Sequence, residues 1–403
     1  MPKKLVIVCL LNFLVAALMG LALRYTFIDA IGFNYRFLTH AHSHVAMLGW
    51  VYLMLYTLIV HYFIPDKKPI YNKLFWITQA SVIGMMLSFP FQGYAAISIT
   101  FSTLHIFCSY YFVRLAWKNH KTDSVVSQYT LKAALIFMVV STIGVWCLGP
   151  AVGLLGQASA FYQIAIQFFL HFQFNGWFLI AVLAVFFHLL KIKDSLVFQK
   201  FFKTLIAGTI LTFALPVQWY APHKALLYIN AIGIILQVAS LFYFLKLIQQ
   251  NVKQFLNRQS KLIIILYYFS LFCFSVKIIL QTFSIIPEFS QVVVNNRNFV
   301  IGFIHLMMLG LISGFLFSFI LKPKKTKQSK ELSIGVYSFL IGFVLTELIL
   351  LVQGCYFYFG IGFIPNYYTL LFFFSTLLPL GLLFILIHFI KTKNHEKQAS
   401  KTP

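Results

Sequence analysis

Long apolar runs separated by short polar breaks recur along nearly the whole 403-residue chain. Only 10% of the residues are charged, whereas a soluble chain carries roughly 25%. Apolar runs of about 18 residues or more are typical of helices that span a bilayer, because lipid offers the backbone no hydrogen-bond partners. Alternating strand patterns of about ten residues, typical of a membrane barrel, do not occur. The sequence therefore predicts an all-α polytopic membrane protein whose surroundings are a lipid bilayer.

About twelve transmembrane helices are expected, in a single membrane domain over residues 1–403. Several links between the apolar runs are short, so consecutive helices should run antiparallel. The expected spans are 5–24, 40–64, 74–90, 93–115, 132–154, 164–190, 204–219, 225–247, 262–286, 299–321, 334–356 and 368–390.

The net charge of +23 follows the helix ends instead of one face, so it indicates membrane topology and no nucleic-acid partner. The amino terminus, the links after even-numbered spans and the carboxyl tail hold 26 of the 31 Lys and Arg residues. Basic residues beside spans stay on the cytoplasmic side. Both termini, including the basic tail 391–403, are therefore expected in the cytoplasm. The absence of a recognisable targeting peptide suits a bacterial-type plasma membrane.

One motif, a His followed five residues later by a Gly, occurs in the second, sixth and tenth spans. A Gln follows each motif His after 47 or 48 residues. This shared register predicts an internal repeat of three pseudo-symmetric four-helix units, near 1–118, 129–247 and 261–390. The motif residues are His44, Gly49 and Gln92, then His171, Gly176 and Gln218, then His305, Gly310 and Gln353.

The three motif histidines are expected at one depth in the membrane. Imidazole is a common metal ligand, and polar groups within a membrane often mark function, so at least two are candidate haem or metal ligands. The alternative is that each His bonds a neighbouring helix and fixes packing. The Gly fits both interpretations, because it permits close helix approach and also leaves room for a flat macrocycle.

Two further histidines precede His44. His40 and His44 are four residues apart on one face and could hold copper or zinc. His42 points about 160° away from His44 on an ideal helix, so only one of the two is expected to face the interior. His105, in the middle of the fourth span, is a weaker candidate.

Lys277 and Glu347 are the two charges placed firmly within spans. An isolated charge at that depth is costly, so they are expected to pair or to line a wet cavity. A structural ion pair and a proton-relay site are both open.

The topology and the His positions in spans two, six and ten resemble the large subunit of haem-copper oxidases. That resemblance implies that His44 and His305 ligate a low-spin haem and that His171 ligates copper. The chain departs from the family where further ligands belong. Span seven has Gln218-Trp219 instead of His-His, and span ten has one His. A complete oxygen-reducing centre is therefore not expected.

The stretches from His42 to Gly49 and from His305 to Gly310 resemble still more closely motifs of the NnrS family. Its members are twelve-span bacterial membrane proteins that bind haem and copper and are linked to nitric oxide stress. The resemblance implies haem b as the cofactor, with copper as a second possibility, and His42 or His44 with His305 as ligands.

Two classes of function follow. The first is a haem- or copper-binding membrane protein related to oxidase large subunits, without a complete oxygen-reducing site. The alternative is a polytopic transporter or channel. Many transporters have inverted repeats with broken helices at the midplane, whereas units of four helices all face the same way. The sequence identifies no catalytic residue.

Overall fold

The computed structural model describes residues 1–321 and 329–391. In these two ranges the regular secondary structure is entirely helical. Twelve helical segments there are long and apolar enough to cross a membrane. This confirms the predicted all-α polytopic fold. Residues 322–328 and nearly all of the basic tail, 392–403, lie outside the described residues.

The twelve spans begin and end close to the expected positions, and most extend a few residues further at one or both ends. In chain order they are α1 (Lys3–Tyr25), α2–η1–α3 (Tyr35–His44, Val45–Tyr52, Leu53–Phe63), α4 (Pro69–Gln92), α5 (Ala96–Asn119), α6 (Val125–Leu155), α7–η2–α8 (Ala160–His171, Phe172–Phe178, Leu179–Leu190), α9–α10 (Leu196–Leu211, Ala214–Tyr220), α11 (Lys224–Leu256), α12 (Lys261–Phe283), α14–η3–α15 (Arg297–His305, Leu306–Ser313, Gly314–Ile320), α16 (Lys330–Tyr358) and α17 (Tyr367–Lys391).

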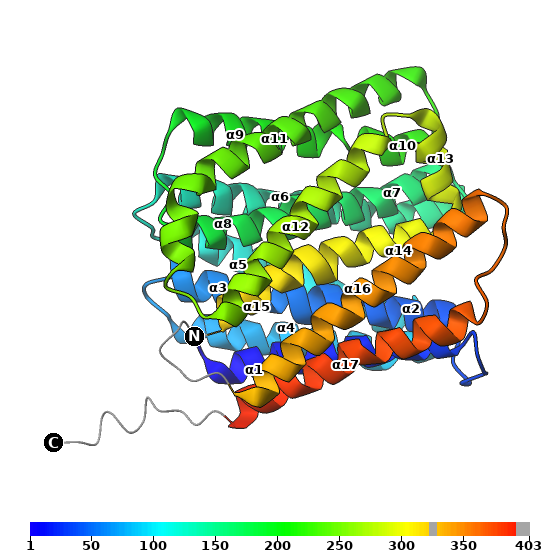
Figure 1. The fold of residues 1–403 in the computed structure, drawn as a ribbon, viewed down its shortest axis with the longest axis horizontal. Coiled ribbons are helices and arrows are strands. Elements are labelled where there is room, and N and C mark those ends of the chain that lie inside the picture. The colour runs from blue at the N-terminus through cyan, green and yellow to red at the C-terminus, as the bar shows by residue number, and fades with distance from the viewer. Residues whose placement is uncertain (322–328, 392–403) are drawn as a thin grey trace.

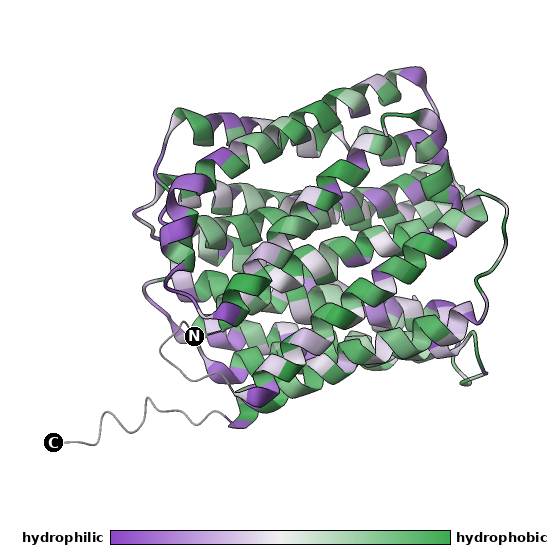
Figure 2. Ribbon diagram, viewed as in Figure 1, coloured by the Kyte–Doolittle hydropathy of each residue, from purple (hydrophilic) through white to green (hydrophobic). Residues whose placement is uncertain are grey.

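The helices lie side by side with their axes roughly aligned, and the links gather at two opposite ends (Figure 1). Hydrophilic residues collect at these ends, while the middle of the bundle is largely apolar (Figure 2). The start of α1 and the end of α17 lie at one end, where Lys3 Nζ donates to the carbonyl oxygen of Ile390. We call this the terminal end and the opposite one the distal end. The arrangement is that expected of a protein that crosses a bilayer.

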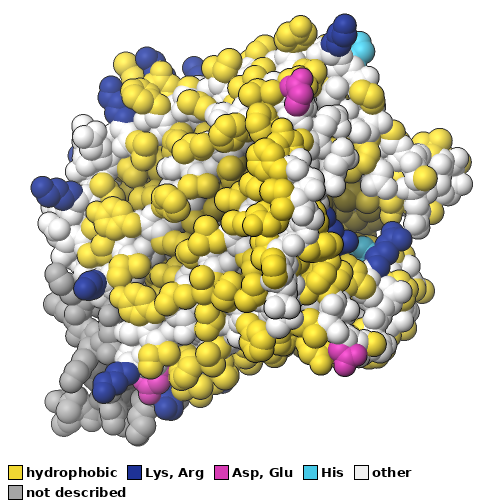
Figure 3. All heavy atoms as spheres, turned by 45° about the vertical axis from the view of Figure 1, so that its right-hand side comes forward, with side chains coloured by type: hydrophobic (Ala, Val, Ile, Leu, Met, Phe, Trp, Pro, Cys, Tyr) yellow, Lys and Arg dark blue, Asp and Glu magenta, His cyan; other side chains and the backbone are white. Residues whose placement is uncertain are grey.

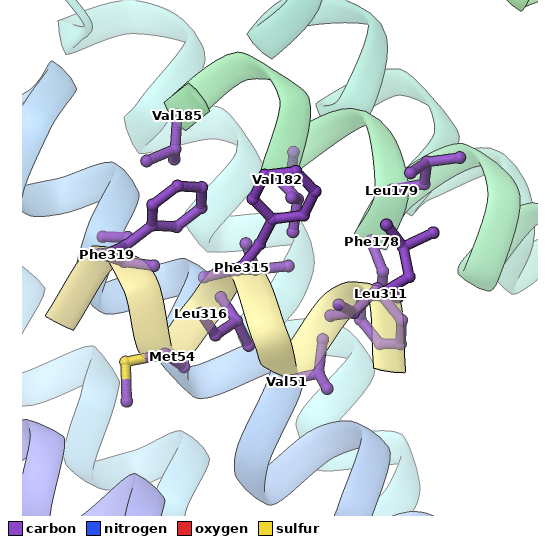
Figure 4. Packing of buried hydrophobic residues seen from close by; sticks show 14 of the residues in the cluster. Val51, Met54, Phe178, Leu179, Val182, Val185, Leu311, Phe315, Leu316 and Phe319 are labelled. Atoms are coloured by element: carbon purple, nitrogen blue, oxygen red, sulfur yellow. The ribbon is translucent and has the colours of Figure 1, made fainter. Parts of the chain in front are cut away.

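The three spans that carry the His motif form the centre of the bundle. Trp50 Nε1 of the second span donates to Ser313 Oγ of the tenth at 2.8 Å. The rings of Phe186 and Phe315 join the sixth span to the tenth, 5.0 Å apart. Figure 4 shows the apolar side chains of these spans packed against one another. The central spans are therefore fixed mainly by dense apolar packing.

Neighbour relations recur along the chain. The third and fourth spans of each expected unit pack together, as α4 with α5, α9 with α11 and α16 with α17. The first span of each unit packs on the second, and α17 packs on α1. A threefold repeat would produce this recurrence, and the three units over 1–118, 129–247 and 261–390 stay a prediction.

The structure differs from the predicted spans at two places near the distal end. The seventh span is interrupted between Leu211 and Ala214, just before Pro216, which cannot donate a helical hydrogen bond. A short helix, α13 (Pro287–Asn295), precedes the tenth span, where the sequence predicted a link. Trp219 Nε1 donates to Ser290 Oγ at 3.1 Å and so joins α10 to α13.

Candidate functional site: a distal cavity lined by histidines

Each motif histidine is the last residue of an α-helical segment and is followed at once by π-helical turns. His44 precedes η1, His171 precedes η2 and His305 precedes η3. In a π-helix the backbone bonds reach five residues back, and such turns are rare and frequent at functional sites. Sequence reasoning missed these segments. The only signal for them is the recurring His-to-Gly spacing, because each π segment contains the motif Gly.

The motif glycines serve helix packing. A Cβ atom on Gly49 would lie 2.9 Å from Val82 and 3.0 Å from Asn12. One on Gly310 would lie 2.7 Å from Cys273 Sγ. Neighbouring helices thus fill the space that the absent side chains leave. The interpretation that these glycines make room for a macrocycle is wrong, and close helix approach explains them.

A cavity of about 1220 Å³ lies in the distal half of the bundle. Figure 3 shows a hollow on this side of the molecule, with His and with Lys or Arg side chains at its margin. Apolar side chains such as Phe13, Leu48 and Met308 make up much of its wall. The titratable side chains around it are His40, His42, His44, His105 and His305 together with Arg24, Arg36, Arg297 and several tyrosines.

The imidazole ring of His42 packs against α1. Its Nδ1 lies 2.7 Å from the carbonyl oxygen of Ala16. A carbonyl can only accept, so Nδ1 carries the proton and Nε2 keeps a lone pair. The ring also packs over Gly20, where a Cβ atom would lie 2.8 Å from His42 Cε1. The helix-to-helix contact therefore fixes the orientation and the tautomer of this imidazole.

His305, on the tenth span, also lines the cavity and lies beside the carboxyl group of Glu347. Its Nδ1 lies 3.6 Å from Glu347 Oε1 of α16. Both atoms are buried, and neither has a hydrogen-bond partner among the described residues. His305 and Arg24 lie close enough to His42 to interact with it electrostatically. The cavity thus brings together one imidazole of the second span and one of the tenth.

His44 also borders the cavity, on the side of α4 and α5. Its Nδ1 donates to the carbonyl oxygen of His40 at 2.8 Å, and Tyr94 Oη lies 3.4 Å from its Nε2. His42 and His44 therefore both line the cavity. The expectation that only one of them faces the interior is wrong, because the cavity is wide enough to reach two faces of the same helix.

His105 is 3% exposed and has a buried Nε2 atom without a hydrogen-bond partner in the described part of the chain. The Tyr52 ring stands edge-on to it at 4.6 Å. His40 packs against the Tyr94 ring at 4.7 Å. Within residues 1–321 and 329–391, no three or more His, Cys, Asp or Glu side chains are grouped to hold a metal ion.

His171 lies apart from the cavity, whose lining does not include it. Its Nε2 donates to the carbonyl oxygen of Thr209 at 2.8 Å. The same carbonyl accepts from Thr212 Oγ1, and Gln237 Nε2 donates to that hydroxyl. Lys277 Nζ donates to Gln237 Oε1 at 3.2 Å. A buried hydrogen-bond chain therefore connects Lys277 to His171.

The expected ion pair between Lys277 and Glu347 does not form. Lys277 is almost fully buried on α12 beside Gln237, whereas Glu347 lies beside His305. Similar depth along the helices could not reveal this, because the two side chains project toward different neighbours.

The recurring glutamines act at the distal links. Gln353 donates to the carbonyl oxygen of Gly362 and accepts from the backbone N–H of Ile364, both at 2.9 Å. Gln218 accepts from the backbone N–H of His223 at 2.8 Å. Gln92 is partly buried at the end of α4. For Gln218 and Gln353 the geometry indicates a structural role in holding these links.

The comparisons with known proteins add no family. No protein-family model matches the chain, and no curated protein matches it significantly. The fold and the cavity therefore define the class, a polytopic helical membrane protein with a histidine-lined distal cavity.

Proposed function

We propose that this chain is a membrane haem protein in which His42 and His305 would hold a haem b. One observation carries the proposal. Imidazoles from the second and tenth spans face one cavity, and an oxygen atom lies near Nδ1 of each: the Ala16 carbonyl oxygen at 2.7 Å from His42 and Glu347 Oε1 at 3.6 Å from His305. Metal-ligating histidines usually have such a partner, which orients the ring and leaves the other nitrogen for the metal.

The size, walls and charges of the cavity suit a haem. Its volume, about 1220 Å³, exceeds the roughly 300–1,000 Å³ usual for ligand sites, so a large ligand has room. Apolar walls would hold a macrocycle, while Arg24, Arg36 and Arg297 line the same cavity and match the haem carboxylates in charge. When bound, a haem with two imidazole ligands would supply one-electron transfer. The residues of the chain hold, orient and shield it.

Purified protein from haem-supplied cells should show a Soret band and, after reduction, the sharp α and β bands of a six-coordinate haem. A protein that remains colourless after expression with haem and after titration with hemin would contradict the proposal. A matched variant, His61→Ala near the terminal end, should keep the spectrum, because His61 is not among the cavity residues.

Copper has weaker support. His40, His44 and His171 were the expected copper or zinc ligands, but His171 lies outside the cavity and no cluster of three ligands forms in the described ranges. A relation to oxidase large subunits or to the NnrS family rests on the sequence motifs and stays part of the proposal.

A transporter or channel is the second candidate, favoured by the size of the cavity and by the buried Lys277. Transport requires access from both ends, whereas Met54, Val185 and Phe319 of the three central spans belong to one buried apolar cluster (Figure 4) and do not line the cavity. Uptake of a solute by proteoliposomes, together with a colourless protein, would favour this candidate.

For orientation, we infer that the terminal end is cytoplasmic. In a background without native cysteines, Asp66→Cys at the terminal end should resist an impermeant thiol reagent in intact cells, because basic links stay inside. Ala158→Cys at the distal end should react. Both positions are exposed. The reverse labelling pattern would overturn the orientation.

A further inference from the structure

The geometry points to a second ligand site, for an uncharged lipid-soluble molecule whose ring carries carbonyl or hydroxyl groups. The cavity extends to both sides of α2. His42 lies on the side of α1 and His305, whereas His44 lies on the side of Tyr94, which precedes α5. We call the part on the side of His44 the α5–α6 chamber. Its lining includes Ile99, Ser102, His105, Thr142, Trp146 and Gln173. The site lies beside the proposed haem and does not depend on it.

The chamber opens sideways between α5 and α6. Tyr110 Oη of α5 contacts Thr142 Oγ1 and accepts from Trp146 Nε1 of α6, so the two helices are joined at this level. Nearer the distal end, Ile99 of α5 and Val152 of α6 line the cavity and are exposed. Both belong to apolar spans, where the surroundings are lipid. A ligand that enters between these helices must therefore be soluble in lipid.

Two buried polar side chains in the chamber wall have an unpaired nitrogen. Gln173, in η2, is 4% exposed, and its Oε1 accepts from Ser141 Oγ at 2.9 Å. Its Nε2 donates to no group in the described part of the chain. His105 of α5 has Ser109 Oγ 3.4 Å from its Nδ1, while its Nε2 has no partner within residues 1–321 and 329–391. Unpaired polar groups are costly away from water, and the oxygen atoms of a ligand would satisfy both.

The charge and shape of the chamber favour an uncharged ring. The three arginines that line the cavity lie on α1, at the start of α2 and at the start of α14. The lining residues of α5, α6, α7 and η2 include no Asp, Glu, Lys or Arg. A carboxylate or phosphate beside Gln173 would therefore lack a counter-charge. Aromatic side chains such as Tyr52, Trp146 and Tyr162 line this side and suit a flat ring. These features favour a quinone-like compound over a fatty acid or a phospholipid.

The test is the binding of a benzoquinone with a decyl tail to the full-length protein in detergent, followed by isothermal titration calorimetry. Decanoate, an anion with a tail of similar length, is the matched competitor. The quinone should bind saturably, and decanoate should not displace it. Gln173→Leu and His105→Phe should each weaken quinone binding by roughly three- to tenfold, the effect of losing one hydrogen bond. Ser141 keeps its bond to the Met138 carbonyl oxygen in Gln173→Leu.

A second pair of variants tests the opening and leaves both polar groups in place. Gly149 of α6 lines the cavity, and an added Cβ atom there meets nothing within 4 Å. Gly153, about one turn further along α6, has the same open surroundings but is not part of the lining. The indole in Gly149→Trp should obstruct the chamber and weaken quinone binding at least about tenfold, whereas Gly153→Trp should bind as the wild type does.

A wild-type protein without saturable quinone binding would overturn the site, as would equal affinities in the wild type, Gln173→Leu and Gly149→Trp. Displacement of the quinone by decanoate would overturn the assignment to an uncharged ring. Because none of these measurements uses haem, a colourless protein that binds the quinone as expected would overturn only the haem function.

Discussion

Replacing His305 by alanine is expected to abolish the low-spin haem spectrum. The tenth span offers no second histidine, and the neighbouring cavity residues Met308 and Leu309 face the site without an imidazole. Without the His305 imidazole, the chain would hold a haem only weakly. The check is the pyridine haemochrome content and the optical spectrum of protein purified in parallel with wild type.

The second span provides a sharper comparison. His42→Ala should remove the low-spin spectrum as His305→Ala does, because His42 is the imidazole within electrostatic reach of His305. His44→Ala should leave the spectrum nearly intact, because the two ring nitrogens of His44 already contact the His40 carbonyl oxygen and Tyr94 Oη. If only His44→Ala loses the spectrum, His44 and not His42 is the residue of the second span that holds the haem.

Gly335→Ala is expected to destabilise the fold by about 1–3 kcal/mol, the usual cost of overpacking. A Cβ atom on Gly335 would lie 2.8 Å from the carbonyl oxygen of Gly381, and one on Gly381 would lie 2.7 Å from that of Gly335. The backbones of α16 and α17 approach each other at these two positions, as small residues allow in membrane helices. The midpoint of thermal unfolding in detergent should fall accordingly.

The matched control is Gly153→Ala in α6, where an added Cβ atom meets nothing within 4 Å. Alanine is the better helix former, so this variant should be neutral or slightly more stable. Equal unfolding midpoints for Gly335→Ala and Gly153→Ala would show that the α16–α17 contact is looser than its geometry indicates.

The positions of the spans could be predicted because hydropathy acts locally. A long apolar run must hydrogen-bond its own backbone in lipid, so composition alone determines helix and approximate length. The break before Pro216 could have been predicted in the same way, because a proline disrupts the helix that contains it. The helix α13 was not, because Pro287–Asn295 is short and has no long apolar run.

The candidate site could be predicted only in part. The motif marked His44, His171 and His305 as equivalent, and each does precede a π-helical segment. Equivalence along the helix axis does not determine what surrounds each ring. His171 donates to a backbone carbonyl outside the cavity, while His42, which is not a motif residue, lies within electrostatic reach of His305.

The sequence by itself determined an all-helical chain with twelve apolar spans, because the burial of apolar side chains and the satisfaction of backbone hydrogen bonds in lipid depend on local composition. Tertiary structure decided which polar side chains meet. Glu347 and Lys277, similar in depth, are separated because α16 packs on α14 and α12 packs on α11. Contacts between polar side chains of different helices depend on the rotation of each helix about its axis. Close packing at glycines such as Gly49 and Gly310 sets this rotation, and hydropathy does not encode it.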